Sequence, residues 1–197
     1  MRIDLLRHGT TGRDGHLDGR TDPPLSEAGW DQFRQQTQSG EWSRVVSSPL
    51  VRARAAAEDY ARRTGCALHV DPDWSELDFG QWDGRKRSDI MSAPEEAALL
   101  EAFYADPMVA APDGESWADL QARVSRAVDR ILVTPELASV LVVTHGGAIR
   151  AALAHLLGWP LRQLWSLRIH PGTRLTLEAG QGADGAPWAE IVEIIQP

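Results

Sequence analysis

The chain has 197 residues, of which 28 are acidic and 20 basic, and its formal net charge at pH 7 is −8. This length favours one domain with a sizeable core. The negative charge argues against a nucleic-acid partner, because non-specific binding to phosphate backbones needs an excess of positive charge. No apolar run approaches the roughly 18 residues of a membrane-spanning helix, so no membrane partner is expected. A lone cysteine, Cys66, and an N-terminus unlike a signal peptide indicate a cytoplasmic location.

The predicted elements alternate between short apolar strands and longer helices. In chain order they are a strand at 3–6, a helix at 26–39, a strand at 45–46, a helix at 50–63, a strand at 67–70, helices at 94–104 and 117–132, a strand at 139–144, a helix at 148–157, and strands at 167–169, 174–178 and 188–195. Residues 140–143 are apolar without alternation, as in a strand buried on both faces of a parallel sheet. This order predicts an α/β fold with a mainly parallel sheet.

Two of the predicted strands run into a histidine that is followed by glycine. His8 follows the first strand and His145 follows the strand at 139–144. Because ligands bind beyond the carboxyl ends of strands in open α/β sheets, both histidines can face one pocket. Arg7 adjoins His8, and Arg52 lies near the start of a predicted helix. Guanidinium groups bind phosphate oxygens through paired hydrogen bonds, so the set indicates a phosphate pocket, although each residue taken alone also suits a structural role.

Four segments of the chain then form an ordered set. They are Leu6-Arg7-His8-Gly9-Thr10, Ser47-Ser48-Pro49-Leu50-Val51-Arg52-Ala53-Arg54, Glu76-Leu77-Asp78-Phe79-Gly80-Gln81-Trp82-Asp83-Gly84 and Thr144-His145-Gly146-Gly147. Together they resemble the motifs of the histidine phosphatase superfamily, in its phosphoglycerate mutase-like branch. The resemblance implies a three-layer sandwich, with helices on both sides of a mainly parallel central sheet. It also implies a single domain over 1–197, with residues 93–114 as a candidate lid.

The same resemblance implies phosphatase chemistry through a phosphohistidine intermediate. By analogy with the family, His8 attacks phosphorus, and water then hydrolyses the adduct. Arg7, Arg52 and His145 would neutralise charge on the transferring phosphoryl group. Glu76 would protonate the leaving alkoxide and later accept a proton from the attacking water. No cofactor or metal is implied, since the histidines lack the local spacing of a two-ligand metal site.

The loop after His8 departs from the family pattern. Many members carry an asparagine there that binds phosphate, whereas this chain has Asp14, which we expect to point away because like charges repel. The short loop at 18–25 and the run at 79–84 most resemble the α-ribazole phosphatase subgroup, which dephosphorylates a nucleotide precursor in cobalamin assembly. A mutase usually carries longer insertions, so a phosphatase is favoured.

The expected partner is therefore a small phosphorylated substrate, and the protein is a candidate homodimer. By analogy, the substrate contacts are expected from Thr10, Thr11, Arg20, Gly146 and Trp82. Trp82 and Trp117 are candidates for stacking on the ring of α-ribazole 5′-phosphate, although aromatic residues more often pack in a core. Two alternatives stay open. A broad-specificity phosphatase for sugar phosphates has the same motifs, and a phosphate-binding regulatory module would need neither His8 nor Glu76.

Overall fold

The apolar strands of the chain assemble into one six-stranded sheet, in the order β3-β2-β4-β1-β5-β6. The computed structural model describes residues 1–134 and 137–197. The strands are β1 (Arg2–Arg7), β2 (Arg44–Ser47), β3 (Ala67–Val70), β4 (Ser139–Thr144), β5 (Arg174–Gln181) and β6 (Pro187–Ile195). The four strands β1 to β4 are parallel, whereas β5 and β6 are antiparallel to their neighbours. The prediction of a mainly parallel sheet is confirmed.

The longer helices begin and end close to their predicted bounds, whereas a short helix at Arg87–Met91 was not predicted. They are α1 (Glu27–Thr37), α2 (Val51–Thr64), α3 (Arg87–Met91), α4 (Pro94–Ala105), α5 (Trp117–Leu132) and α6 (Gly146–Leu157), with short 3-10 helices η1 (Pro72–Trp74), η2 (Gly80–Trp82) and η3 (Leu161–Ser166). Local capping explains several starts: the side chain of Ser26 accepts the Gly29 N–H at α1, and Ser116 and Asp119 form a capping box at α5. Within the described ranges, no helix is long and apolar enough to cross a membrane.

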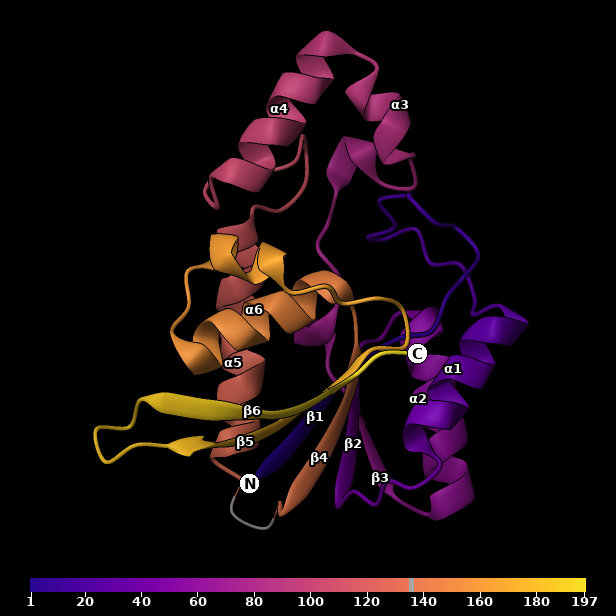
Figure 1. Ribbon diagram of the computed structural model, residues 1–197, viewed down its shortest axis with the longest axis vertical. Coiled ribbons are helices and arrows are strands. Elements are labelled where there is room, and N and C mark those ends of the chain that lie inside the picture. The colour runs from indigo at the N-terminus through magenta and orange to yellow at the C-terminus, as the bar shows by residue number, and fades with distance from the viewer. Residues whose placement is uncertain (135–136) are drawn as a thin grey trace.

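Helices cover both faces of the sheet, because successive strand residues point to opposite sides. Leu5 of β1 and Val142 of β4 belong to the core shared with α5 and α6. Their neighbours Leu6 and Val143 belong to the core shared with α1 and α2. All four side chains are fully buried. Figure 1 shows the resulting three layers, which confirm the predicted sandwich.

One predicted strand, at 167–169, is wrong. The chain instead forms η3 and continues as a loop. In this loop the Leu167 carbonyl accepts a hydrogen bond from Arg150 and the Ile169 carbonyl accepts one from Arg7. The backbone groups that a strand would offer to the sheet are bound by side chains of two other elements. A short apolar stretch alone does not reveal such long-range partners.

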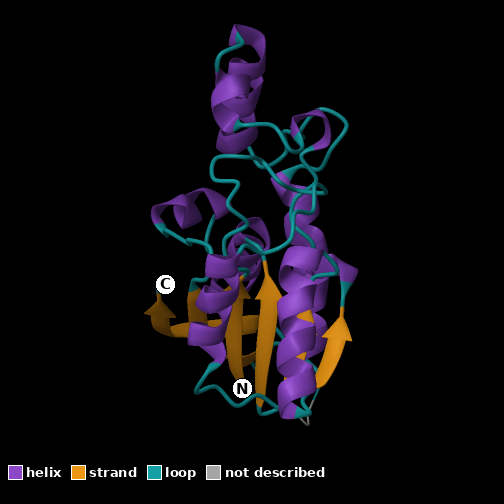
Figure 2. Cartoon of the chain, turned by 90° about the vertical axis from the view of Figure 1, so that its right-hand side faces the viewer, coloured by secondary structure: helices purple, strands orange, loops and turns teal. Residues whose placement is uncertain are grey.

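The carboxyl ends of the parallel strands lie at the end of the molecule where α3, α4 and the longest loops gather. Figure 2 shows the arrowheads of the upright strands pointing toward this end. The helices α3 and α4 form a hairpin that extends beyond the sheet (Figure 1). Phe103 of α4 is fully buried and packs on Trp82 and Trp117, with ring centroids 5.6 and 5.8 Å away. This aromatic contact fixes α4 against η2 and the start of α5.

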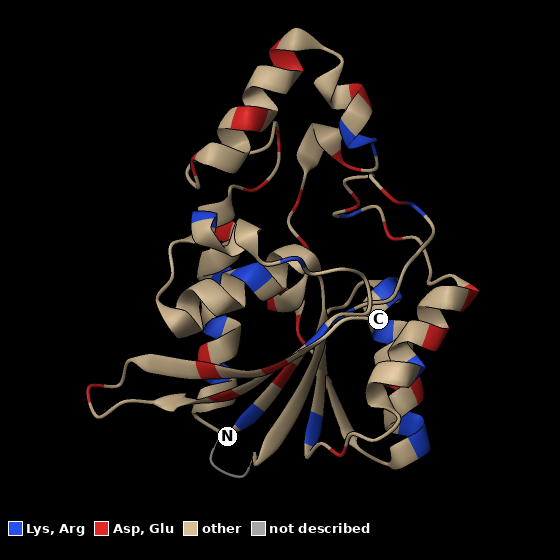
Figure 3. Cartoon of the chain, viewed as in Figure 1, with Lys and Arg blue, Asp and Glu red and all other residues tan. Residues whose placement is uncertain are grey.

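Most charged side chains remain on the surface. Figure 3 shows acidic and basic residues interspersed along α1 and α2, where Arg54 pairs with Glu58 and Arg63 pairs with Asp59. Such exposed pairs contribute little to stability. Three arginines are buried instead: Arg52, Arg123 and Arg174. Because a buried charge needs partners, these three mark places where the interior is organised around a guanidinium group.

Candidate active site

The centre of the site is a pair of buried histidines. Since β1 and β4 are parallel neighbours with Arg7 opposite Thr144, the residues that follow lie side by side. The His8 N–H donates to the Thr144 carbonyl at 2.9 Å, and the rings of His8 and His145 have centroids 5.1 Å apart. His8 is 8% exposed and His145 is not exposed at all. The structure therefore brings together the two histidines that the strand-end pattern singled out.

The hydrogen bonds of His8 determine which ring nitrogen is free. Nδ1 lies 2.8 Å from the Gly9 carbonyl oxygen. A carbonyl can only accept, so Nδ1 carries the proton and Nε2 keeps its lone pair. Burial, followed by the positive charges of Arg7 and Arg52, holds the pKa of His8 well below the ordinary 6.5. The ring is neutral, with an unprotonated nitrogen available for nucleophilic attack.

Arg7 lies beside the start of α6. One of its terminal nitrogens donates to the Ile169 carbonyl at 2.8 Å. Its Nε is buried and has no partner among the described residues. A Cβ placed on Gly146 would lie 3.5 Å from this nitrogen, so Nε and the N-terminus of α6 share one corner of the site. Both carry positive charge or partial charge, an arrangement that suits an anion.

Arg52 lines the cavity and also binds a neighbouring loop. It is 1% exposed, and its two terminal nitrogens make four hydrogen bonds to the loop at 18–22. The acceptors are the carbonyls of Asp18, Gly19 and Thr21 and the carboxylate of Asp22. Arg52 therefore orders this loop while its charge acts on the histidines, lowering the pKa of both.

The carboxylate of Glu76 is held by two backbone N–H groups, one from the next residue and one from the first turn of α6. One carboxylate oxygen accepts the Leu77 N–H at 3.0 Å, and the other accepts the Gly147 N–H at 3.1 Å. A Cβ on residue 147 would come within 2.3 Å of this carboxylate, so a larger residue there would displace Glu76 from its position. The helix N-terminus thus holds Glu76 in place at the edge of the histidine pair.

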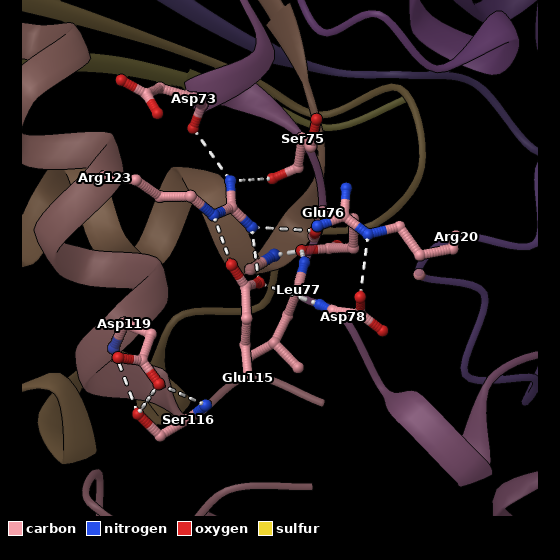
Figure 4. A network of polar contacts seen from close by, with 12 residues as sticks. Arg20, Asp73, Ser75, Glu76, Leu77, Asp78, Glu115, Ser116, Asp119 and Arg123 are labelled. Carbon is pink, nitrogen blue, oxygen red and sulfur yellow. Dashed lines mark hydrogen bonds and ion pairs between the residues drawn. The ribbon is translucent and has the colours of Figure 1, made fainter. Parts of the chain in front are cut away.

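The backbone that carries Glu76 is clamped by Arg123 of α5, as Figure 4 shows. Arg123 donates to the carbonyls of Asp73, Ser75 and Glu76, at 2.9, 2.7 and 2.9 Å. It also makes a bidentate pair with Glu115, at 2.9 and 2.8 Å. These bonds satisfy a buried guanidinium group and fix an irregular segment that has no ladder of its own.

Three arginines of the site, Arg13, Arg123 and Arg150, were missed in the sequence. Arg123 interrupts the apolar face of a predicted helix, between Leu120 and Val124, and a charge at such a position was the available signal. Arg150 lies one turn after Gly146, so its side chain is on the same face as the helix start. It donates to the Gly146 carbonyl at 3.0 Å and stacks on Trp165, 4.8 Å from the ring centroid.

A cavity of about 340 Å³ opens above these groups. One end of the cavity is lined by the histidine, the glutamate and three arginines, namely Arg7, His8, Arg52, Glu76 and Arg150. An aromatic wall is formed by Phe79, Tyr104, Trp117 and Trp165. A polar wall is formed by Arg13, Asp14, His16 and Asp18. This volume suits a small ligand with one anionic group. In the described ranges, no three His, Cys, Asp or Glu side chains are grouped so that they could hold a metal ion.

The predicted substrate contacts divide into two sets. Thr10, Thr11 and Gly146 line the cavity. Arg20 and Trp82 are not among its lining residues, which corrects their prediction as substrate contacts. Arg20 pairs with Asp78 at 3.1 Å, half exposed (Figure 4). Trp82 is 1% exposed and belongs to the aromatic core, the commoner role of a tryptophan.

Trp117 and Asp14 both line the cavity. Trp117, the other stacking candidate, lines the cavity although it is 4% exposed. Asp14, which we expected to point away from a phosphate, is exposed but lies among the lining residues. Its charge raises the pKa of Arg7, although burial has the larger, opposite effect. Asp14 therefore adds a negative charge to the cavity.

The fold and the site define an α/β protein with an anion pocket built around a neutral histidine pair. The chain belongs to the histidine phosphatase superfamily (branch 1), whose family model matches residues 3–185. This finding agrees with the family that the four motifs resemble.

Relatives place the chain among several members of this family. The bifunctional protein Rv2228c of Mycobacterium tuberculosis is 38% identical over 158 residues, which are 77% of this chain and 43% of that protein. The match thus spans less than half the length of this relative. The adenosylcobalamin/alpha-ribazole phosphatase of Salmonella typhimurium is 29% identical over 188 residues, covering 92% of both chains. A mycobacterial glucosyl-3-phosphoglycerate phosphatase structure superposes with a TM-score of 0.84 at 28% identity, covering 96% of both chains.

The neutral histidine pair predicts that the protein loses stability below neutral pH. Burial is the main cause that holds the pKa of His8 and of His145 well below 6.5. In the unfolded chain both take up a proton near pH 6.5, whereas in the folded chain they stay neutral. Their contribution to stability is therefore complete above that pH and is lost as the pH falls, by up to about 1.4 kcal/mol per pH unit for each histidine.

Urea unfolding at intervals between about pH 7.5 and about pH 5.5 measures this slope, above the range in which carboxylates titrate. The slope should be smaller in His8→Gln. A free energy of unfolding that does not change over this range would contradict the neutral state of the pair.

Proposed function

We propose that this chain hydrolyses a small phosphomonoester through a phosphohistidine formed on His8. One observation carries the proposal: beside the free Nε2 of His8, two buried nitrogens have no hydrogen-bond partner in the part of the chain that the structure describes, the Nε of Arg7 and the Nδ1 of His145. Buried donors are nearly always satisfied, and leaving them unpaired is costly. Phosphoryl oxygens bound at His8 would supply the missing acceptors.

The reaction then follows from the positions of the side chains. In the first step, Nε2 of His8 bonds to phosphorus as the bond to the leaving oxygen breaks, and Glu76 in its protonated form donates its proton to that oxygen. In the second step, Glu76 accepts a proton from water, whose oxygen bonds to phosphorus and releases His8. Arg7, Arg52 and the N-terminus of α6 stabilise negative charge throughout.

The aromatic wall supports α-ribazole 5′-phosphate as the substrate, which would place the protein in cobalamin biosynthesis. Tyr104, Trp117 and Trp165 pack edge to face or tilted, with Trp117 and Trp165 at 4.9 Å. Their faces and edges offer a planar ring a large contact area beside the phosphate end of the cavity. The relative from Salmonella typhimurium bears this activity in its name and matches nearly the whole chain.

The polar wall favours a second candidate, a sugar phosphate. Arg13 and Asp18 form a bidentate pair, at 2.9 and 3.0 Å, and His16 lines the same side of the cavity. Such groups can bond to hydroxyls. The glucosyl-3-phosphoglycerate phosphatase neighbour bears a sugar-containing substrate in its name. A broad-specificity phosphatase would use both walls.

Residues 93–114 suit the role of a lid within a single domain. Tyr104 of α4 lines the cavity, and its neighbour Phe103 is buried in the core. A segment anchored at one residue and facing substrate with the next can order itself around the leaving group and exclude water.

His8→Ala should abolish turnover, because it removes the atom that bonds to phosphorus. Rapid quenching of the wild type with a ³²P-labelled phosphomonoester should trap an acid-labile, base-stable adduct on His8. His69→Ala, at an exposed histidine on β3, is the matched control and should retain full activity. Residual activity within about tenfold of wild type would exclude His8 as the nucleophile. Phosphate binding with neither turnover nor adduct would favour a regulatory module.

Glu76→Gln should affect substrates according to their leaving groups. An amide cannot donate the proton that an alkoxide needs, so kcat for an alkyl phosphate should fall by about 10²- to 10⁴-fold. Hydrolysis of p-nitrophenyl phosphate should fall much less, since its phenolate leaves without a proton. Steady-state kinetics with both substrates make the comparison, and equal losses would refute the role of Glu76 as the acid.

Phosphate release from a panel of substrates should identify the leaving group. We expect the highest kcat/KM for α-ribazole 5′-phosphate, ahead of ribose 5-phosphate, glucosyl-3-phosphoglycerate and 3-phosphoglycerate. Trp165→Ala should lower kcat/KM for the ring-bearing substrate about two- to tenfold, the value of one aromatic contact, and leave ribose 5-phosphate unchanged. If the sugar phosphates are hydrolysed as well as α-ribazole 5′-phosphate, the second candidate is correct.

A further inference from the structure

The second histidine of the site, His145, has a partner that the reaction above does not use. Ser48 follows β2, the strand on the other side of β4 from β1. Its Oγ lies 2.7 Å from Nε2 of His145, and neither residue is exposed to solvent. At this distance the two groups share a full hydrogen bond, and the direction of that bond decides which nitrogen of His145 is protonated.

The surroundings of Ser48 settle the direction. The N–H of Leu50 donates to the same Oγ at 3.2 Å. A backbone N–H cannot accept, so the hydroxyl proton has to go elsewhere. Among the described residues, Nε2 of His145 is the one acceptor to which this hydroxyl hydrogen-bonds. Ser48 therefore donates its proton to Nε2.

A neutral imidazole that accepts at Nε2 carries its proton on Nδ1. Burial, together with the charge of Arg52, lowers the pKa of His145 well below 6.5, so the ring stays neutral. Its Nδ1 is buried and has no partner among the described residues. One N–H donor without a partner among the described residues is thus fixed beside His8, which lines the cavity, whereas His145 is fully buried and is not itself a lining residue.

We propose that Ser48 is a positioning residue that holds His145 in the tautomer whose Nδ1–H binds a phosphoryl oxygen of the substrate. The proposal rests on the proposed function of the pocket. In the opposite tautomer, Nε2–H would donate to Ser48 and the lone pair of Nδ1 would face the anion. That arrangement would repel the phosphoryl group and would leave the hydroxyl proton of Ser48 without an acceptor.

The two histidines then share one tautomer and use it in opposite ways. Both carry the proton on Nδ1. The Nδ1–H of His8 donates to the Gly9 carbonyl, and its unprotonated Nε2 faces phosphorus. The Nε2 of His145 accepts a hydrogen bond from Ser48, and its Nδ1–H donates to the phosphoryl oxygens. One ring attacks and the other stabilises charge, and their hydrogen-bond partners on neighbouring loops make the difference.

Side-chain ¹⁵N NMR on the free wild-type protein near neutral pH tests the tautomer directly and needs no turnover. We expect a protonated Nδ1 and a bare Nε2 on His145. His8, assigned through His8→Gln, should show the same pattern and serves as an internal reference. A protonated Nε2 on His145 would overturn the proposal, even if the protein proves to be an active phosphatase.

Ser48→Ala tests the consequence for binding and catalysis. We expect the Nδ1–H tautomer of His145 to be depleted, inorganic phosphate to bind about three- to tenfold more weakly, and kcat/KM to fall about 10- to 100-fold, as when outer partners of metal-bound histidines are removed. Ser48→Thr, which keeps the hydroxyl, should restore the tautomer. Ser47→Ala is the matched control: Ser47 is equally buried but donates to the Ser48 carbonyl at 2.8 Å, not to His145.

An unchanged tautomer and unchanged phosphate affinity in Ser48→Ala would overturn the positioning role. If Ser48→Ala does not fold, the wild-type spectrum still decides. If the protein hydrolyses no phosphomonoester, the tautomer and the phosphate titration still report on Ser48, so a failure of the proposed function is recognised separately.

Discussion

The parallel pairing of β1 with β4 is the constraint on which the site depends. It places the backbone of His8 against that of Thr144, and therefore the imidazole of His8 against that of His145. Because both strands are covered by helices on both faces, the two rings are buried where the strands end. Burial keeps both rings neutral, which a nucleophile and an uncharged donor both require.

Around this pair the protein gathers positive charge that it does not fully neutralise. Arg7, Arg52 and Arg150 all have a pKa lowered mainly by burial, and Glu76 is the opposite charge that acts on all three. Two buried nitrogens of the site, the Nε of Arg7 and the Nδ1 of His145, have no hydrogen-bond partner among the described residues, and an unpaired buried donor costs free energy. Backbone clamps compensate: Arg52 orders the loop at 18–22, and Arg123 fixes the segment that carries Glu76. Arginines that bond to backbone carbonyls thus hold the segments around the anion pocket in place.

Much of the fold and of the chemistry could be predicted where the signal was local. A strand that runs into His-Gly is a local signal, confined to about eight consecutive residues, and so His8, His145 and Arg7 were found. Arg20 and Trp82 were mistaken because proximity in the sequence to a motif does not show where a side chain points. Trp82 enters the aromatic core with Phe103, and Arg20 pairs with Asp78. The strand at 167–169 failed for a similar reason, since its carbonyls bond to distant arginines.

By itself, the sequence determined the alternation of strands and helices, the two strand-end histidines and the acidic residue of the third motif, because apolar periodicity and short motifs act over a few residues. Only the tertiary structure decided which charges enter the cavity and how each is held. Arg150 bonds to the Gly146 carbonyl at the start of α6, and Arg123 of α5 bonds to the Glu76 carbonyl. Ser48 bonds to His145, which lies 97 positions away in the sequence. Hydrogen bonds between such distant residues depend on how the layers pack, which no local pattern encodes.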